Sequence, residues 1–433
     1  MASKVTRYVE FLACTTLLCL VAFGQMNTAE IGGVVKDVVG YSVPHATITA
    51  VSAATQVKFT AVTNDSGEYL FTQVPVGSYS LTISRQGFNQ ASFENLILHI
   101  GDRIRQDFVL TVGEQSEVVV VQEGAGPLQT EPAAIRDVVD SQQVLGFPLK
   151  DREFLQLSLM SAGIVSPPGG TRGDSLQQTG KLVNILGQRT GHNLFLLDGV
   201  SVTDEYFNNV VLDPPPEAIE EFNISKTNYS AEFGGKSGGV INVLTRSGTN
   251  RFHSSFYEFL RNDIFDAKNF FAIANHSTPP FRENQFGGSL GGPLARDKTF
   301  FFIDYGGVQV RKSLSHLFGV PMFAQRSGVF STTINNPFTG APFPGNTINL
   351  PLDSAAEALL SRVPLPNLSG NSSNLLAVDK QDNRNNQGSV RVDHQFSSHD
   401  SAYLRASVFD ANEVDPFGSS VLNEASCPDS GER

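Results

Sequence analysis

Few residues of this chain have the types and spacing that catalysis would need. Gly235-Lys236-Ser237 ends like a phosphate-binding loop, but that motif requires glycine where Ser230 stands. The eight histidines are scattered without the spacing of a zinc site, and Asp198, Asp204 and Glu205 do not match a calcium-binding loop. We therefore predict no catalytic residue, no metal site and no cofactor, and we do not expect an enzyme.

A second kind of chemistry, backbone pairing, is predicted for residues 113–123. Four successive valines form a β-prone run there, between charged and polar neighbours. An unpaired segment of this type can add as a strand to the sheet of a partner protein. The candidate partner-binding residues are Glu117, Val118, Val119, Val120 and Val121. The same run is equally typical of the last strand of a preceding domain or the first strand of a following one, and both interpretations stay open.

The N-terminal residues predict export from the cytoplasm. The apolar stretch 11–24 is about fourteen residues long, shorter than the ~20 that a membrane-spanning helix needs. It follows Lys4 and Arg7 and ends in Ala22-Phe23-Gly24, a small-x-small pattern typical of a cleavage site. We expect residues 1–24 to be a signal peptide.

Charge and cysteine content exclude further classes of function. The formal net charge is −12 and no basic run is present, which argues against nucleic acid as a partner. Cys14 and Cys19 lie within the predicted signal peptide, so only Cys427 would remain after cleavage. No disulfide or cysteine metal site could then form within the mature chain.

Residues 25–112 are predicted to form a small β-sandwich. The segment Asn64-Asp65-Ser66-Gly67 is a strong hairpin signal, because Asp and Gly tolerate the left-handed backbone conformation. Residues 74–79 supply a second turn. The runs rich in β-branched and aromatic residues lie at 46–51, 58–63, 69–71 and 79–83.

Residues 124–250 alternate between helical and strand-like patterns. Residues 141–159 predict a short helix broken near Pro148, and residues 193–202 predict a buried strand pair around an Asp198-Gly199 turn with solvated acids nearby. Residues 214–228 predict a second short helix, at residues 217–222, and a strand. We expect its exposed face and N-terminal end to carry Glu217, Glu220 and Glu221.

The Gly-Gly pairs that begin at Gly234 and Gly238 are expected to let the backbone turn tightly or approach another surface closely. They precede a strand-like run at residues 240–244.

Later in the chain, residues 389–396 and 402–408 alternate apolar and polar side chains and are joined by a four-residue turn. Such a hairpin suits a transmembrane barrel, with apolar side chains outward and polar ones inward, but a soluble sandwich has the same alternation. Residues 335–374, rich in Pro, Asn and Gly, predict a long loop.

Four phrases in order resemble TonB-dependent outer-membrane receptors of the Oar-like group. The first, residues 228–250, resembles the end of the plug domain, where the chain passes from plug to barrel. The other three lie at residues 256–262, 280–293 and 297–305. The resemblance implies a plug at residues 124–250 and barrel strands from residue 251 onward.

A separate resemblance covers the predicted sandwich. Gly33-x-Val35-x-Asp37, residues 63–69, residues 75–81 and Gly87-Phe88 are similar to the carboxypeptidase regulatory-like domain, a transthyretin-like β-sandwich. That domain has no peptidase chemistry of its own. It also resembles starch-binding sandwiches, so contact with a glycan is an open expectation.

Together the resemblances imply a mainly β chain: signal peptide 1–24, sandwich 25–112, linker 113–123, mixed α/β plug 124–250 and strands of an incomplete barrel at 251–433. The linker occupies the place of the TonB box, the segment that pairs with TonB. The implied function is uptake across the outer membrane, energised by the TonB complex of the inner membrane, with outer-membrane lipid around the barrel. The external ligand is unidentified: siderophore, cobalamin, oligosaccharide and peptide all remain open.

One departure from the family concerns length. Its barrels close with twenty-two strands, whereas about 180 residues follow Asn250, enough for roughly five strands of about ten residues with their loops. We therefore expect the chain to be a fragment of a longer receptor. The alternative is a periplasmic or surface module that binds carbohydrate or protein through the β-sandwich.

Overall fold

The computed structural model describes residues 27–416 except 114–117, 121–127, 132–134, 148, 150–151, 167–181, 190, 205–207, 209, 268–279, 352, 371–372, 399 and 415. The predicted signal peptide and Cys427 lie outside the described residues. The chain forms two compact units. One contains the residues up to Ser255 with Gly288–Tyr305 and Gly388–Ser407, and the other contains Phe256–Gly287, Gly306–Gln387 and the residues from Val408 onward.

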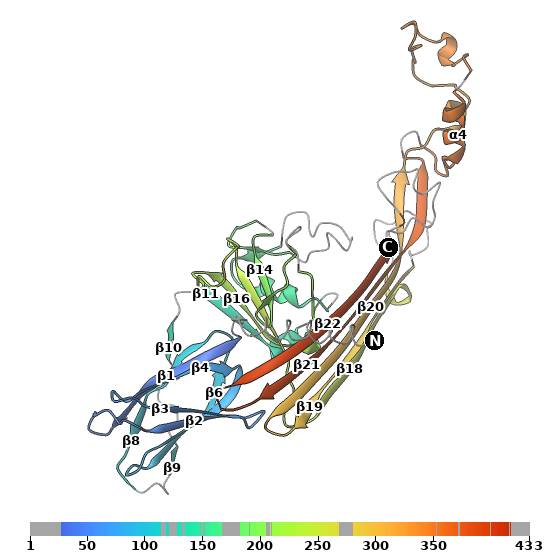
Figure 1. Cartoon of the computed structure of the whole chain (residues 1–433). Helices are drawn as coiled ribbons and strands as arrows, with labels where there is room; N and C mark the ends of the chain where they lie inside the picture. The colour runs from blue at the N-terminus through green and yellow to red at the C-terminus, as the bar shows by residue number, and fades with distance from the viewer. Residues whose placement is uncertain are drawn as a thin grey trace, which may run out of the picture. The chain divides into compact units, whose positions relative to one another are not determined.

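Two β-sheets enclose one hydrophobic core in the N-terminal part of the first unit, drawn in blue in Figure 1. One sheet has the order β3-β2-β5-β6-β9, and the other has the order β10-β7-β1-β4 with β8 also paired to β1. The strands are β1 (Thr28–Asp37), β2 (Thr47–Ser52), β3 (Lys58–Val62), β4 (Glu68–Pro75), β5 (Gly77–Ser84), β6 (Gln90–Leu98), β7 (Arg103–Arg105), β8 (Phe108–Leu110), β9 (Val118–Val120) and β10 (Leu128–Glu131). The predicted β-sandwich is confirmed.

Alternation of side chains builds the core of the sandwich. Ile48, Leu81 and Ile83 are fully buried, while their neighbours along β2 and β5 are partly exposed. Side chains of successive strand residues point to opposite faces, so each strand sends every second residue into the core. Full burial of such a side chain stabilises the fold by about 1.5–3 kcal/mol.

The turn at residues 64–67 forms as predicted, but it does not make a hairpin. Gly67 has a φ of 75°, and its N–H donates to the carbonyl of Asn64 at 2.9 Å. However, β3 before the turn pairs with β2, and β4 after it pairs with β1 in the other sheet. The turn therefore carries the chain from one sheet to the other, because the apolar faces of both strands must cover the same core.

A second sheet in the same unit has the order β11-β16-β17-β14-β15. Its strands are β11 (Ile135–Asp140), β14 (Leu194–Leu197), β15 (Val200–Ser201), β16 (Ile219–Thr227) and β17 (Val240–Thr245). Nearby lie α2 (Ser141–Gly146), the 3₁₀ helices η3 (Phe154–Met160) and η4 (Pro216–Ala218), and the strand pair β12 (Ile164–Val165) and β13 (Asn184–Ile185). The predicted strand pair around Asp198-Gly199 is confirmed, but only β14 is buried, whereas both residues of β15 are exposed. The break after the first short helix is confirmed.

The predicted helix at residues 217–222 is wrong. A 3₁₀ turn ends at Ala218, and Ile219 begins strand β16 between β11 and β17. Ile219, Phe222 and Ile224 are fully buried there. Tertiary pairing on both sides overrides the weak helical signal of the glutamates, and Glu221 becomes a buried residue of the strand.

The glycines before β17 allow the close approach that the sequence predicts. A Cβ at Gly238 would lie 2.4 Å from Oδ1 of Asn193, and a Cβ at Gly239 would lie 2.5 Å from Cδ1 of Ile185. Both contacts are shorter than real Cβ contacts allow, so larger residues would displace the neighbouring segments. All six residues of β17 are buried.

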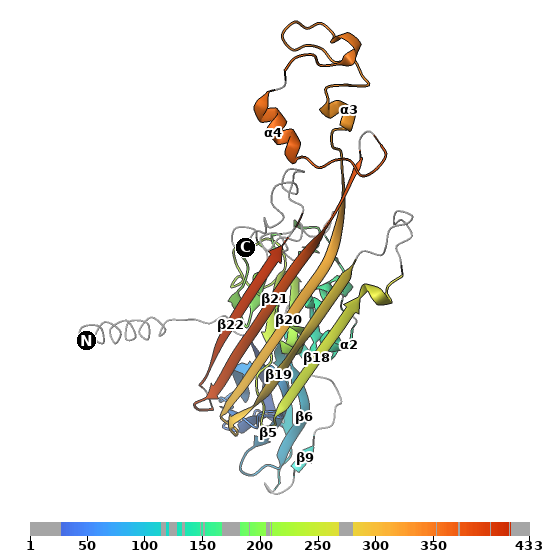
Figure 2. The same ribbon diagram turned by 90° about the vertical axis from the view of Figure 1, so that its right-hand side faces the viewer.

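The remaining strands form a five-stranded sheet in chain order (Figure 2). They are β18 (His253–Asn262), β19 (Phe281–Ala295), β20 (Thr299–Phe318), β21 (Leu375–Gln395) and β22 (Ser401–Val414). Val390 and Leu404 are 44% and 73% exposed, whereas Ser389 is 8% exposed. In this hairpin Val390 and Leu404 thus point away from the protein and Ser389 points inward, which is the pattern of a membrane barrel. In β20, by contrast, Phe300 and Phe302 are buried.

The segment between β20 and β21 contains more regular structure than the predicted loop. It holds α3 (Phe323–Arg326), the 3₁₀ turn η6 (Pro344–Asn346) and α4 (Ser354–Arg362), and a further 3₁₀ turn, η5 (Asp263–Phe265), follows β18. Asp353 caps α4 by accepting from the N–H groups of Ala355 and Ala356. Among the described residues, no helix is both long and apolar enough to cross a membrane.

Candidate functional site

The candidate partner-binding valines lie at an outer edge of the sandwich. Val118–Val120 form β9, which pairs in parallel with β6 so that Val118 lies opposite Gln90 and Val120 lies opposite Ser92. Glu117 and Val121 lie outside the described residues. Of the interpretations that the sequence left open, this structure adopts the strand of the sandwich. Pairing with a partner stays a prediction.

Residues on both sides of β9 are tied to the sandwich. Before it, the N–H of Gly113 donates to the carbonyl of Gly87 at 3.2 Å, and the N–H of Asn89 donates to the carbonyl of Thr111 at 2.8 Å. After it, β10 pairs antiparallel with β7, with Leu128 opposite Arg105. The chain is therefore held to one sheet of the sandwich through β9 and to the edge of the other through β10.

A buried carboxylate joins the second sheet to the hairpin of β21 and β22. Asp198 follows β14, has a φ of 50° and is 3% exposed. Its Oδ1 accepts from the N–H of Thr245 at 2.8 Å, and its Oδ2 accepts from the hydroxyl of Thr245 at 2.7 Å. The Asp-Gly turn in a left-handed conformation thus aims the carboxylate at the strand beside it.

Two arginines of the hairpin complete the environment of this carboxylate. Nη1 of Arg391 lies 3.1 Å from Oδ1 of Asp198, and Nη1 of Arg405 lies 2.9 Å from Oδ2. The Tyr403 hydroxyl donates to the backbone carbonyl of Asp198 at 2.7 Å, and the Arg391 guanidinium lies over the Tyr403 ring at 4.7 Å. Arg391 also pairs with Asp393 at 2.8 Å, so two positive and two negative charges meet here.

The sequence did not identify this cluster. The expectation of solvated acids at the Asp198-Gly199 turn is wrong for Asp198, because the hairpin excludes water from it. One signal was present: Arg391 and Arg405 lie on the polar side of the alternating strands, the side predicted to face inward. A cation on an inward face requires an anion opposite, but sequence spacing alone does not say which of the many carboxylates provides it.

A second polar cluster joins the sandwich to β16 and β11. Oε2 of Glu221 lies 2.7 Å from Nδ1 of His99, and Oε1 accepts from the N–H of Ile100 at 2.7 Å. The hydrogen bond to Glu221 raises the pKa of His99 above its usual range, although burial opposes this effect. Arg136 forms an ion pair with the buried Asp102 beside it.

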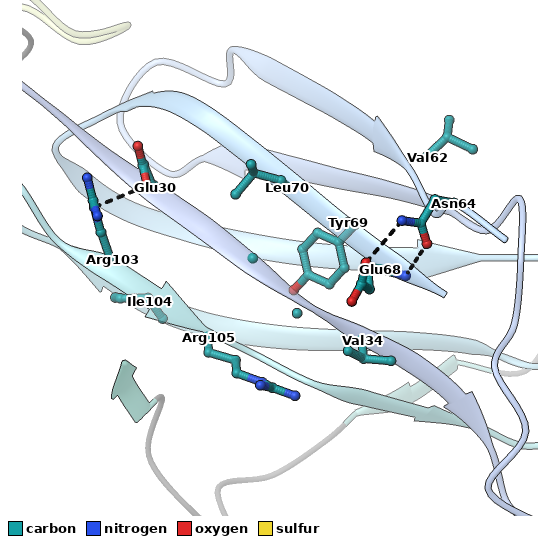
Figure 3. A pocket seen from close by; sticks show the side chains of 12 residues that line it. Glu30, Val34, Val62, Asn64, Glu68, Tyr69, Leu70, Arg103, Ile104 and Arg105 are labelled. Atoms are coloured by element: carbon teal, nitrogen blue, oxygen red, sulfur yellow. Dashed lines mark hydrogen bonds and ion pairs between the residues drawn. The ribbon is translucent and has the colours of Figure 1, made fainter. Parts of the chain in front are cut away.

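A groove of about 550 Å³ lies on the sandwich along β1, β4 and β7 (Figure 3). Its charged side chains pair with their neighbours: Nε of Arg103 lies 3.3 Å from Oε2 of Glu30, and the amide of Asn64 donates to Glu68 at 3.1 Å. Tyr69, the aromatic residue of the lining, is buried and donates to the carbonyl of Gln106 at 2.7 Å. It therefore offers no free ring face on which a sugar could stack.

The Gly235-Lys236-Ser237 segment is held within its own domain. Lys236 donates to the side chain of Asn208, and Oγ of Ser237 lies 2.9 Å from Nδ1 of His192. The segment connects strands β16 and β17, whereas a phosphate-binding loop leads into a helix. This context contradicts a phosphate-binding loop at these residues.

Three family models match the chain. A carboxypeptidase regulatory-like domain matches residues 30–111, a TonB-dependent receptor plug domain matches residues 131–240, and an outer membrane β-barrel domain matches residues 244–432. Strand β9 lies between the first two matches. The second sheet with Asp198 is therefore the plug, and the five-stranded sheet belongs to the barrel domain.

Individual proteins are also similar to this chain. The TonB-dependent transporter Oar of Myxococcus xanthus is 28% identical over 302 residues, which are 66% of this chain and 27% of that protein. The chain thus spans well under half the length of this curated relative. Among solved structures, the siderophore receptor PirA of Acinetobacter baumannii is 17% identical with a TM-score of 0.38, covering 66% of this chain and 33% of that one. The outer membrane transporter YddB of Escherichia coli is 11% identical with a TM-score of 0.41, covering 64% and 33%.

Proposed function

We propose that this chain, whose domains are those of a TonB-dependent outer-membrane receptor with an N-terminal regulatory-like sandwich, serves the uptake of an external ligand energised through TonB. The observation that carries the proposal is the contact between plug and hairpin. The carboxylate of Asp198 in the plug is held by Arg391 and Arg405, on strands that expose Val390 and Leu404. Such strands suit lipid on one side and a plug on the other.

The proposed mechanism is mechanical, and no covalent bond is broken. A ligand binds on the external side of the plug, TonB pairs with the segment from Glu117 to Val121, and force from the inner membrane displaces the plug. The predicted signal peptide at residues 1–24 would deliver the chain for outer-membrane insertion.

Site-directed cross-linking in cells tests the role of TonB. A Val119→Cys variant is expected to form a cross-link to TonB, because strand addition brings its backbone beside the partner strand. The matched control is Val39→Cys, a 75% exposed valine elsewhere on the sandwich. The cross-linked species should be recovered in the outer-membrane fraction. If Val119→Cys reacts no more than Val39→Cys, this segment is not the TonB box.

The alternative function, a periplasmic or surface module that binds carbohydrate through the sandwich, has a candidate location in the groove beside Tyr69. The ion pair of Arg103 with Glu30 and the burial of Tyr69 do not favour it. Binding of the full chain to immobilised polysaccharide, abolished by Arg103→Ala and unaffected by Arg85→Ala outside the groove, would support this alternative.

A further inference from the structure

The strands that end the two sheets of the sandwich differ in how they protect their outer edges. A sheet edge presents unpaired N–H and C=O groups, and proteins usually guard it with a charged residue or proline. Strand β3 contains Lys58, β4 contains Glu68 and Pro75, and β10 contains Glu131. Strand β9, at the remaining end, consists of three valines.

The pairing of β9 leaves one of its two edges available. One edge pairs with β6 between Gln90 and Ser92, and β9 is the last strand in the order of its sheet. Within the described part of the chain, no strand pairs with its other edge. The β6 contact fixes the valines in an extended conformation before any partner arrives.

We propose that the sandwich presents the TonB-binding segment as a docked edge strand, and that a strand of TonB extends the sheet β3-β2-β5-β6-β9 at the outer edge of β9 while β9 stays on β6. This inference rests on the proposed function, since it takes the valines as the TonB box. The sandwich is then part of the TonB-docking surface and not only a domain that precedes it.

Two physical arguments favour docking on the paired strand. Ordering an extended backbone costs conformational entropy, and β9 is ordered before TonB binds. Hydrogen bonds from β6 and from a new partner use opposite edges of one strand, so neither set competes with the other. The negative residues that flank the valines in sequence, Glu117 and Glu123, suit a partner strand with basic neighbours.

The test locks β9 onto β6. The full chain carries Cys427→Ser, so that no native cysteine of the mature chain reacts. Gln90→Cys and Val118→Cys are added, because these residues lie opposite each other in β6 and β9. A short reducible thiol cross-linker then joins the two cysteines. The register control is Ser92→Cys with Val118→Cys, two residues out of alignment, which should cross-link less. Affinity for the purified periplasmic domain of TonB is measured before and after reduction.

We expect the locked chain to bind TonB within threefold of the reduced chain. A loss of tenfold or more that reduction restores would overturn the proposal, because β9 would then have to leave β6. Equal cross-linking of the register control would also contradict it, since β9 would not hold the stated register.

A second variant separates this inference from the proposed function. Val119→Pro removes a backbone donor and is expected to weaken TonB binding at least tenfold, whereas Val109→Ala, in strand β8 of the other sheet, should not. Unchanged affinity of Val119→Pro would show that TonB docks elsewhere. If the unaltered chain does not bind TonB at all, the proposed function itself fails. Binding that the lock abolishes refutes only the docked-edge mechanism.

Discussion

The sandwich and the β21–β22 hairpin share one pattern of alternating side chains but use it in opposite directions. In the sandwich, Leu81 and Ile83 point into the core. In the hairpin, Val390 and Leu404 point outward, while Arg391 points inward to the plug. Alternation follows from the pleat of any strand, so it does not reveal which face meets water.

What distinguishes the two regions is the partner of the polar face. Polar side chains on the outer faces of the sandwich, such as those of Arg103 and Glu30, lie at the surface, where solvent helps to solvate them. The arginines of the hairpin face the plug, where Asp198 and Asp393 neutralise them. An inward polar face therefore requires matched charges, and the apolar face is left for a nonpolar solvent such as lipid.

Of the substitutions considered, Asp198→Asn is expected to cause the largest loss of stability. The substitution keeps the shape of the side chain but leaves Arg391 and Arg405, 11% and 12% exposed, without their shared anion. Breaking a buried ion pair in this way typically costs about 3–5 kcal/mol. Hydrogen exchange at the Thr245 amide measures the local opening free energy of the plug. Asp65→Asn, a 98% exposed aspartate, is the control and should have no effect. A change below about 1 kcal/mol at Asp198 would show that the charges are not coupled.

A smaller effect is expected from charging the outward face of the hairpin. Leu404→Lys should lower recovery of the folded chain in lipid bilayers, because lysine at the middle of a bilayer costs about 2–4 kcal/mol on a barrel surface. The matched variant is Leu70→Lys on strand β4 of the sandwich. Both leucines are more than half exposed, at 73% and 58%. If the two variants fold into vesicles equally well, the outer face of the hairpin does not meet lipid.

The sequence predicted most elements because their local signals agree with their environment. The alternating runs of the sandwich and the Gly-Gly segment before β17 are examples, since turn chemistry and apolar pattern indicate the same structure. The strand predicted within residues 214–228 was given too late a start, because its glutamates and a preceding proline imitate a helix start, whereas β16 begins at Ile219. Pairing with β11 and β17, both distant in sequence, decides its conformation.

The candidate site was only partly predictable. The valines of β9 could be identified, but which edge they occupy depends on β6, whose residues lie about thirty positions earlier. Asp198 could not be recognised as buried, since its two cations come from residues about two hundred positions later. Local spacing carries no information on such contacts, and the resemblance to a plug did not specify them.

The smallest effect concerns the polar contact between sandwich and plug, which water still reaches. His99 is 33% exposed, and its pKa is raised by the hydrogen bond to Glu221. The contribution of the His99–Glu221 contact to the stability of the fold is therefore fully present below the pKa of an unfolded histidine, about 6.5. This contribution is lost as the pH rises through the pKa of His99 in the folded chain. Partial exposure screens the pair, so we expect at most about 0.5 kcal/mol.

The measurement is hydrogen exchange at the Ile100 amide, which donates to Glu221, between pH 5 and 8, corrected for the intrinsic rate. In the unaltered chain the protection should decrease as the pH rises, and His99→Gln should remove this dependence. His45→Gln, an exposed histidine on the same sandwich, should leave it intact. A pH dependence that survives His99→Gln would assign it to another group. If the pH changed the opening free energy at Ile100 as much as Asp198→Asn changes it at Thr245, water would be excluded from the His99–Glu221 contact as completely as from Asp198. The plug would then not differ in its contacts with the sandwich and with the hairpin.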